Sequence, residues 1–304
     1  METEQVRIVE VGPRDGLQNE PGTVATATKV ELVQRLEAAG LRTIEATSFV
    51  HPRWVPQLAD ADEMFATLRR SPHVSYPVLT PNLRGLERAL AVGVQEAAVF
   101  VAASDAFNLR NINRTTAESV AISHEVVTAA KREGLRVRAY VSTVCGCPYQ
   151  GDVPVSDVLD LTDQMFSMGV EEVSLGDTIG VGTPGQVRAL IETLTSRLGA
   201  DRLAVHMHDT YGQGLANSLA AIEAGIRVVD TSVGGLGGCP YAPGASGNLA
   251  TEDLVYALRG SRFETGVDLD ALVRITAWMS EVLTRPVTSR VAQARLAAAE
   301  QGDG

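Results

Sequence analysis

Short runs of β-branched and apolar residues alternate along the chain with longer stretches whose apolar positions recur at helical spacing. The short runs predict buried strands, and the longer stretches predict amphipathic helices. Eight strands are expected at residues 7–11, 43–47, 75–79, 97–101, 136–143, 172–176, 203–208 and 228–231. Eight helices are expected after them, at residues 26–39, 58–70, 83–92, 116–133, 155–168, 184–198, 215–224 and 251–258. This alternation is typical of an α/β fold with parallel strands.

Most of the predicted helices end at a glycine that precedes the next strand: Gly40, Gly93, Gly134, Gly169, Gly199 and Gly225. Glycine just beyond a helix avoids the steric cost of a left-handed conformation. Eight units of helix, glycine and strand predict a (β/α)8 TIM barrel over residues of about 6–260. Residues 269–283 and 287–299 predict additional C-terminal helices, at about 268–300. We therefore expect residues 1–304 to form a single catalytic barrel domain.

An open, doubly wound sheet is the alternative fold for this alternation of strands and helices. Such a sheet is expected to carry a glycine-rich phosphate-binding turn, G-x-G-x-x-G, after its first strand. Here the first strand is followed by VGPRDGLQ at residues 11–18, which does not match that pattern. The barrel is therefore favoured over the open sheet.

Composition excludes several classes of partner. The net charge of −11 argues against nucleic-acid binding, which needs a basic surface, and no apolar run is long enough to span a membrane. Only Lys29 and Lys131 are lysines, so arginines, backbone amides or a metal must meet anionic ligands. Three cysteines indicate a reducing compartment. With no leader-like N-terminal segment, we expect a soluble cytoplasmic protein.

Histidines two residues apart provide the strongest local signal for a functional site. His206 and His208 lie on a predicted strand, where side chains at this spacing share one face. Active sites of such barrels lie at the C-terminal ends of the strands, where Asp15 and Asn248 are also expected. Two imidazoles, a carboxylate and an amide oxygen suit Mg²⁺ or Mn²⁺, with Zn²⁺ as an alternative.

Other charged residues are predicted at the same end of the barrel. Arg14 precedes Asp15, and an arginine beside a divalent ion could neutralise a developing enolate oxygen. Glu45 and Asp177 are single carboxylates on otherwise apolar strands, where an unpaired charge is costly. Each of them either functions in catalysis or holds an arginine or a loop amide.

Cys239 lies in a glycine-rich segment, residues 234–247, that follows the eighth strand. Closure of such a loop could bring the thiol to the metal site for proton transfer, and the alternative is a structural loop. Cys145 and Cys147 have no partners that would make them a metal signature, so we interpret them as structural.

Four segments together resemble one enzyme family. GPRDGLQNE at residues 12–20, GDTIG at 176–180, HMHD at 206–209 and SVGGLGGCPY at 232–241 are similar to those of the hydroxymethylglutaryl-CoA lyases. The similarity runs from about residue 6 to about residue 290. The glycine loop with its cysteine is specific to the lyases, whereas the Arg-Asp and H-x-H elements also occur in Claisen-type condensing enzymes.

The resemblance implies a role for each candidate residue. Arg14 would stabilise the enolate of departing acetyl-CoA, and Glu45 and Asp177 would belong to the catalytic network. Cys239 would act in proton transfer, and the base could be Asp177, His206 or Cys239. The implied metal ligands are Asp15, His206, His208 and Asn248. The implied reaction cleaves 3-hydroxy-3-methylglutaryl-CoA into acetoacetate and acetyl-CoA, as in leucine breakdown.

An acyl-CoA substrate needs contacts for its phosphates and pantetheine. The polar segment after the fourth strand, residues 108–114, is the candidate for them, although it could equally be a solvated loop. Its proposed contacts are Asn108, Arg110, Asn111, Asn113 and Arg114. We also expect a homodimer or higher homo-oligomer. The rival functions are a lyase for a longer-branched thioester, an acetyl-CoA-dependent condensing synthase, and an inactive barrel that serves as a scaffold.

Overall fold

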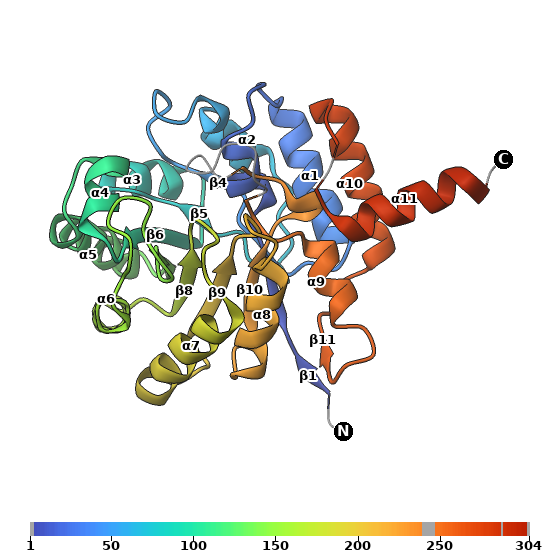
Figure 1. Cartoon of the computed structure of the whole chain (residues 1–304). Coiled ribbons are helices and arrows are strands. Elements are labelled where there is room, and N and C mark those ends of the chain that lie inside the picture. Colours follow the sequence, from blue (N-terminus) through green and yellow to red (C-terminus); the bar gives the residue numbers. More distant parts are fainter. Residues whose placement is uncertain (1–2, 239–246, 287, 303–304) are drawn as a thin grey trace.

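Parallel strands form the centre of the fold in a computed structural model of the chain, which describes residues 3–238, 247–286 and 288–302 (Figure 1). All strands of the main sheet run in the same direction, in the order β3-β2-β10-β9-β8-β7-β6-β5-β4. Their bounds are Arg7–Glu10 (β2), Thr43–Ile44 (β3), Thr47–Ser48 (β4), Val78–Leu79 (β5), Glu96–Ala102 (β6), Arg136–Ser142 (β7), Glu172–Asp177 (β8), Leu203–Met207 (β9) and Val228–Thr231 (β10). Every predicted strand has its counterpart here.

The sheet closes into a barrel because β3 and β4 are two halves of one chain segment. β3 pairs with β2 at one end of the strand order, and β4 pairs with β5 at the other end. The predicted strand at residues 43–47 is therefore interrupted at residues 45–46. There Glu45 N donates to Glu10 O at 2.9 Å, and Ala46 N donates to Pro77 O at 3.0 Å. The expected (β/α)8 barrel is confirmed, with its second strand broken at Glu45.

Helices surround the barrel, and most begin and end within a residue or two of the predicted bounds. They are Thr26–Ala38 (α1), Ala61–Thr67 (α2), Leu83–Ala91 (α3), Thr116–Arg132 (α5), Val155–Ser167 (α6), Pro184–Leu198 (α7), Gly214–Glu223 (α8) and Thr251–Ala257 (α9). α2 is shorter than the predicted helix at 58–70, because Pro56–Leu58 forms a separate 3₁₀ turn. In the described residues, no helix is long and apolar enough to cross a membrane.

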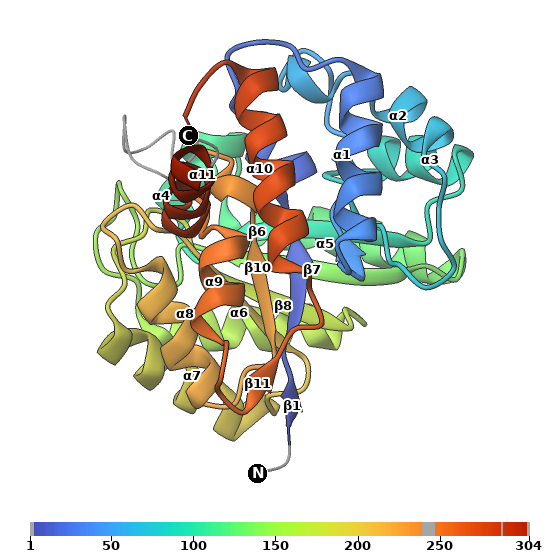
Figure 2. The ribbon, with the colours of Figure 1, turned by 90° about the vertical axis from the view of Figure 1, so that its right-hand side faces the viewer.

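Two helices follow the barrel, as predicted, at Leu269–Leu283 (α10) and Arg290–Gly302 (α11). In Figure 2, α10 lies between α1 and α11, and α11 lies above α9. The sequence analysis did not predict the small parallel pair of Glu4–Gln5 (β1) and Phe263–Glu264 (β11). Because β1 leads directly into β2, this pair lies at the N-terminal end of the barrel, opposite the strand ends where a site is expected.

Candidate metal and substrate site

The loop after β2 brings Arg14 and Asp15 to the C-terminal rim of the barrel. It forms one wide helical turn, Gly12–Gly16, in which the amides of Asp15 and Gly16 both donate to Val11 O. The turn needs its glycines, since a Cβ on Gly16 would lie 2.8 Å from the Ser232 hydroxyl oxygen. This tight packing fixes the two charged side chains at the mouth of the barrel.

Asp15, His206 and His208 form a cluster whose ligand atoms all lie within 4.8 Å of one another. The Nε2 atoms of the two imidazoles are 3.2 Å apart. His206 is the last residue but one of β9 and His208 follows that strand, so both side chains point to the same side, as predicted. Two nitrogens and a carboxylate oxygen at this spacing could share one divalent ion.

Asn248 completes the predicted ligand set. Its side-chain nitrogen donates to Asp15 Oδ2 and to Leu236 O, each at 3.0 Å. Its side-chain oxygen is buried and has no hydrogen-bond partner among the described residues. A buried amide oxygen usually has a partner, so this unsatisfied acceptor fits a cation beside Asp15.

The environment keeps Asp15 ionised and His208 neutral, and it acts on His206 in the opposite direction. Burial, followed by the neighbouring His206, lowers the pKa of His208 to about 3, which keeps its imidazole neutral. For Asp15, burial raises the pKa, but Arg14 and the histidines outweigh burial and lower it below its usual range. For His206, burial lowers the pKa, but Asp230 and Asp15 outweigh it and raise the pKa. The cluster thus offers a carboxylate and a neutral imidazole, the forms that ligate metals.

Arg14 is oriented by two carboxylates. Its Nε donates to Glu45 Oε2 and its Nη1 to Asp15 Oδ1, each at 2.7 Å. Burial lowers the pKa of Arg14, but Glu45 and Asp15 outweigh burial and raise it, so the guanidinium stays charged. Glu45 is fully buried at the break between β3 and β4, and its carboxylate contacts this arginine there. The contact with Arg14 is thus present, and a place for Glu45 in the catalytic network stays a prediction.

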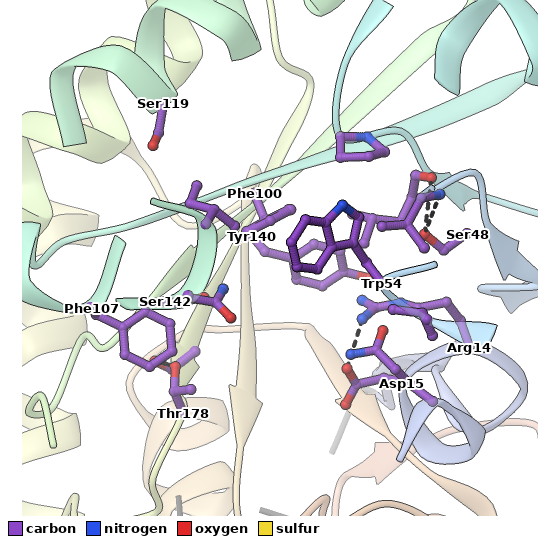
Figure 3. A pocket seen from close by; sticks show the side chains of 18 of the residues that line it. Arg14, Asp15, Ser48, Trp54, Phe100, Phe107, Ser119, Tyr140, Ser142 and Thr178 are labelled. Atoms are coloured by element: carbon purple, nitrogen blue, oxygen red, sulfur yellow. Dashed lines mark hydrogen bonds and ion pairs between the residues drawn. The ribbon is translucent and has the colours of Figure 1, made fainter. Parts of the chain in front are cut away.

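A cavity of about 900 Å³ opens over this cluster. Arg14, Asp15, His206 and His208 all line it. In Figure 3, Trp54, Tyr140 and Phe100 lie between Arg14 with Asp15 on one side and Phe107 with Thr178 on the other. The cavity is therefore polar near the cluster and aromatic beyond it. Such a division suits an extended ligand that reacts at one end.

The predicted CoA-binding segment is helical rather than a loop. Residues Asp105–Ile112 form α4, which begins at the Ser104 N-cap, and Asn113 caps its end in a left-handed conformation. Asn108 is buried, its amide bonds to Ala102 and Thr116, and it does not line the cavity, so its contact with CoA stays a prediction. The other four residues, Arg110, Asn111, Asn113 and Arg114, do line the cavity.

Asp177 is buried at the end of β8, and it does not line the cavity. Its two carboxylate oxygens accept hydrogen bonds from the amides of Val181 and Gly182, at 3.2 and 2.9 Å. These bonds hold the loop after β8, and a catalytic role for Asp177 stays a prediction.

The cysteines divide into two groups. Cys147 is buried, its sulfur accepts a hydrogen bond from the Ser104 hydroxyl at 3.0 Å, and burial raises the pKa of Cys145 above its usual range. A structural role fits both. Cys239 lies outside the described residues, although its neighbour Gly238 lines the cavity.

Sequence reasoning missed Tyr140, which lies on β7 and lines the cavity. Its ring lies between two arginines, with Arg138 Cζ at 4.9 Å and Arg14 Cζ at 5.3 Å from the ring centroid. Its buried hydroxyl has no hydrogen-bond partner in the part of the chain that the structure describes. A tyrosine in an apolar strand carries no charge signal, which is why the pattern alone did not select it.

Comparison with known proteins gives one consistent result. The HMGL-like family model matches residues 5–279. The hydroxymethylglutaryl-CoA lyase of Bos taurus, named as mitochondrial, is 52% identical over 95% of this chain and 89% of its own length.

Solved structures agree with these matches. The hydroxymethylglutaryl-CoA lyase of Pseudomonas aeruginosa superposes with a TM-score of 0.95 at 52% identity, covering 98% of this chain and 99% of its own. An HMG-CoA lyase of Acinetobacter baumannii, solved with coenzyme A and 3-methylmalate, superposes with a TM-score of 0.91 at 38% identity, covering 95% of each chain.

Proposed function

The chain belongs to the HMGL-like family, and on that premise we propose that it cleaves 3-hydroxy-3-methylglutaryl-CoA into acetoacetate and acetyl-CoA. It is then a carbon–carbon lyase, as its relatives are named. The observation that carries the proposal is the cluster of Asp15, His206 and His208 beside the buried Arg14 at one end of the cavity. That set matches a reaction in which a hydroxyl loses its proton and an enolate forms.

We propose Mg²⁺ or Mn²⁺ as the ion of this site, held by Asp15, His206, His208 and the side-chain oxygen of Asn248. A divalent ion bound there would lower the pKa of the tertiary hydroxyl of the substrate. Membership of the family implies a divalent metal, and the mixed oxygen and nitrogen donors suit these two ions.

Arg14 acts on the charge that develops when the C2–C3 bond breaks. Its guanidinium lines the cavity and is already oriented by Glu45 and Asp15, so it needs no rearrangement when an enolate oxygen forms. Acetoacetate leaves from one side of the broken bond, and the enolate of acetyl-CoA takes up a proton on the other.

We propose that one or more of His206, Asp177 and Cys239 transfer the protons of the reaction. Of the three, His206 lines the cavity. Asp177 is engaged with the amides of the loop after β8. Cys239 follows Gly238 in the chain, and its family resemblance supports a role in proton transfer.

Coenzyme A is the proposed partner, lying along the cavity from the cluster toward the end of α4. Arg110 and Arg114 are the proposed phosphate contacts, and Asn111 and Asn113 add polar groups to the same wall. The related lyase solved with coenzyme A and 3-methylmalate supports this class of ligand.

We also propose a cytoplasmic location, a homodimeric or higher homo-oligomeric state and a role in leucine breakdown. The free thiols of Cys145 and Cys147 support a reducing compartment such as the cytoplasm. The bovine relative is named as mitochondrial, so the location needs its own test. Cell fractionation tests the location, and analytical ultracentrifugation tests the assembly.

The function is tested with a coupled acetoacetate assay on metal-stripped protein. We expect no turnover without metal and recovery with Mg²⁺ or Mn²⁺. A longer-branched thioester assayed in parallel tests the rival lyase, and acetyl-CoA with 2-oxo acids tests the synthase. Failure of every acyl-CoA substrate with metal present would overturn the proposal.

A further inference from the structure

Charged side chains run through the interior of the barrel beneath the metal cluster. Arg7 on β2 pairs with Glu172 on β8, Glu172 pairs with Arg138 on β7, and Arg138 pairs with Asp230 on β10. Arg138 is 1% exposed and Asp230 is 2% exposed. Interiors of such barrels are filled mainly by branched apolar residues, so buried charges here call for a specific reason.

Asp230 lies at the end of this row that meets the metal cluster. It is the register partner of His206 on the neighbouring strand β9 (Figure 1). His206 Nδ1 lies 3.4 Å from Asp230 Oδ2, an ion-pair distance at which no hydrogen bond is formed among the described residues, whereas His206 Nε2 faces His208. The two nitrogens of one imidazole are therefore directed to different partners, a carboxylate and the proposed ion.

The carboxylate of Asp230 is itself held in place. Arg138 donates from both terminal nitrogens, one to each oxygen, and the Ser174 hydroxyl donates to Oδ2 at 2.7 Å. Glu172 Oε1 accepts from Arg138 Nε at 2.7 Å and holds the guanidinium from its other side. Three donors from β7 and β8 thus prevent the carboxylate from turning away from His206.

We propose that Asp230 is a positioning residue of the metal site, which orients His206 so that Nε2 faces the ion. A carboxylate that accepts the other ring N–H of a metal-bound histidine fixes the tautomer and the ring direction. The sequence carries the same signal here as at Glu45, a single carboxylate in an apolar strand. This inference rests on the proposed metal site.

Two variants separate positioning from simple stability. Asp230→Asn removes the charge that faces His206, and Glu172→Gln removes the other buried carboxylate that pairs with Arg138. Each change removes one ion pair of Arg138, but only Asp230→Asn alters the group that faces His206. Mn²⁺ affinity of each full-length variant is measured by electron paramagnetic resonance, at a temperature where circular dichroism shows it folded.

We expect Asp230→Asn to weaken Mn²⁺ binding by about 10- to 100-fold and Glu172→Gln to change it by less than about twofold. Equal affinities for Asp230→Asn and the unaltered chain, or equal losses in both variants, would overturn the inference while leaving the metal site standing. If the unaltered chain binds no Mn²⁺, the metal site fails and this inference fails with it.

A measurement on the unaltered chain covers the case in which Asp230→Asn does not fold. Nitrogen-15 NMR of the Mg²⁺-loaded protein, with histidines labelled, reports which ring nitrogen carries the proton. We expect the proton of His206 on Nδ1, facing Asp230. A proton on Nε2 would contradict the inference.

Discussion

Arg14 is the residue whose environment is most specialised, because a buried guanidinium bonds to two carboxylates and still faces the cavity. Arg14→Met should lower kcat by on the order of 10² or more, since it removes the group that meets the enolate charge. Mn²⁺ affinity should stay within about tenfold, because the proposed ligands remain. Acetoacetate assays and Mn²⁺ titration measure both.

The loss of Arg14 also leaves Glu45 buried without its partner, so some stability is lost as well. Arg35→Met is a suitable control, since Arg35 forms an exposed pair with Glu31 within α1. The control should keep normal kcat. Near-normal kcat in Arg14→Met would refute the role of Arg14.

Tyr140 offers a second test at the residue scale. Its hydroxyl is buried and lacks a hydrogen-bond partner among the described residues, so Tyr140→Phe should leave the melting temperature unchanged or slightly higher. If the hydroxyl contacts substrate, kcat/KM should fall by about tenfold or more. Tyr211→Phe, at a tyrosine that is 68% exposed, is the matched control. Unchanged kcat/KM in Tyr140→Phe would exclude the contact.

At the scale of elements, the alternating pattern was sufficient for the strands and helices but not for their irregularities. Strand 228–231 and helices 184–198 and 269–283 were predicted to the residue. The break at Glu45 was missed, because it lies where the segment changes its pairing partner from β2 to β5, which only the closed barrel determines. α4 was missed, because its asparagines are typical of loops, whereas here Asn108 bonds inside the fold and Asn113 caps the helix.

The site was predictable wherever charged residues interrupt apolar strands or sit at their ends. His206, His208, Asp15 and Arg14 come together as expected, because strand ends meet at one rim. The neutral Tyr140 carried no such signal. Asp230, like Glu45, is a single carboxylate in an apolar strand. Its partner Arg138 is 92 residues away in the chain, and only the fold brings the two together.

The start of α9 contains an acid whose burial predicts a pH effect. Glu252 accepts from Gly234 N and from the Thr276 hydroxyl, and burial raises its pKa from 4.5 to about 8. The folded chain therefore holds this proton more tightly than the unfolded chain does. The contribution of Glu252 to the free energy of unfolding is full below about pH 4.5. It declines as the pH rises toward 8, by at most about 1.4 kcal/mol per pH unit.

Glu252→Gln should flatten this decline. Burial also raises the pKa of Glu10, to about 7, so part of the pH dependence should remain. Urea unfolding between pH 5 and 8 measures the free energy of unfolding, and Glu223→Gln at an exposed site of α8 is the control. An identical pH dependence in Glu252→Gln and the unaltered chain would refute the assignment to Glu252.

At the scale of the whole molecule, the barrel brings distant segments to one rim. Asp15 and Asn248 are 233 residues apart in the chain, yet their side chains are hydrogen-bonded beside the two histidines. The opposite end of the barrel carries β1 and β11, away from the proposed reaction. The proposed reaction thus lies at the C-terminal end of the barrel, as in other folds of this type.

The central claim is one divalent ion shared by Asp15, His206 and His208, and anomalous diffraction from Mn²⁺-loaded crystals tests it most directly. We predict one peak at the C-terminal rim, about 2–2.5 Å from both Nε2 atoms and from a carboxylate oxygen of Asp15. A peak elsewhere, or none at full Mn²⁺ loading, would contradict the account.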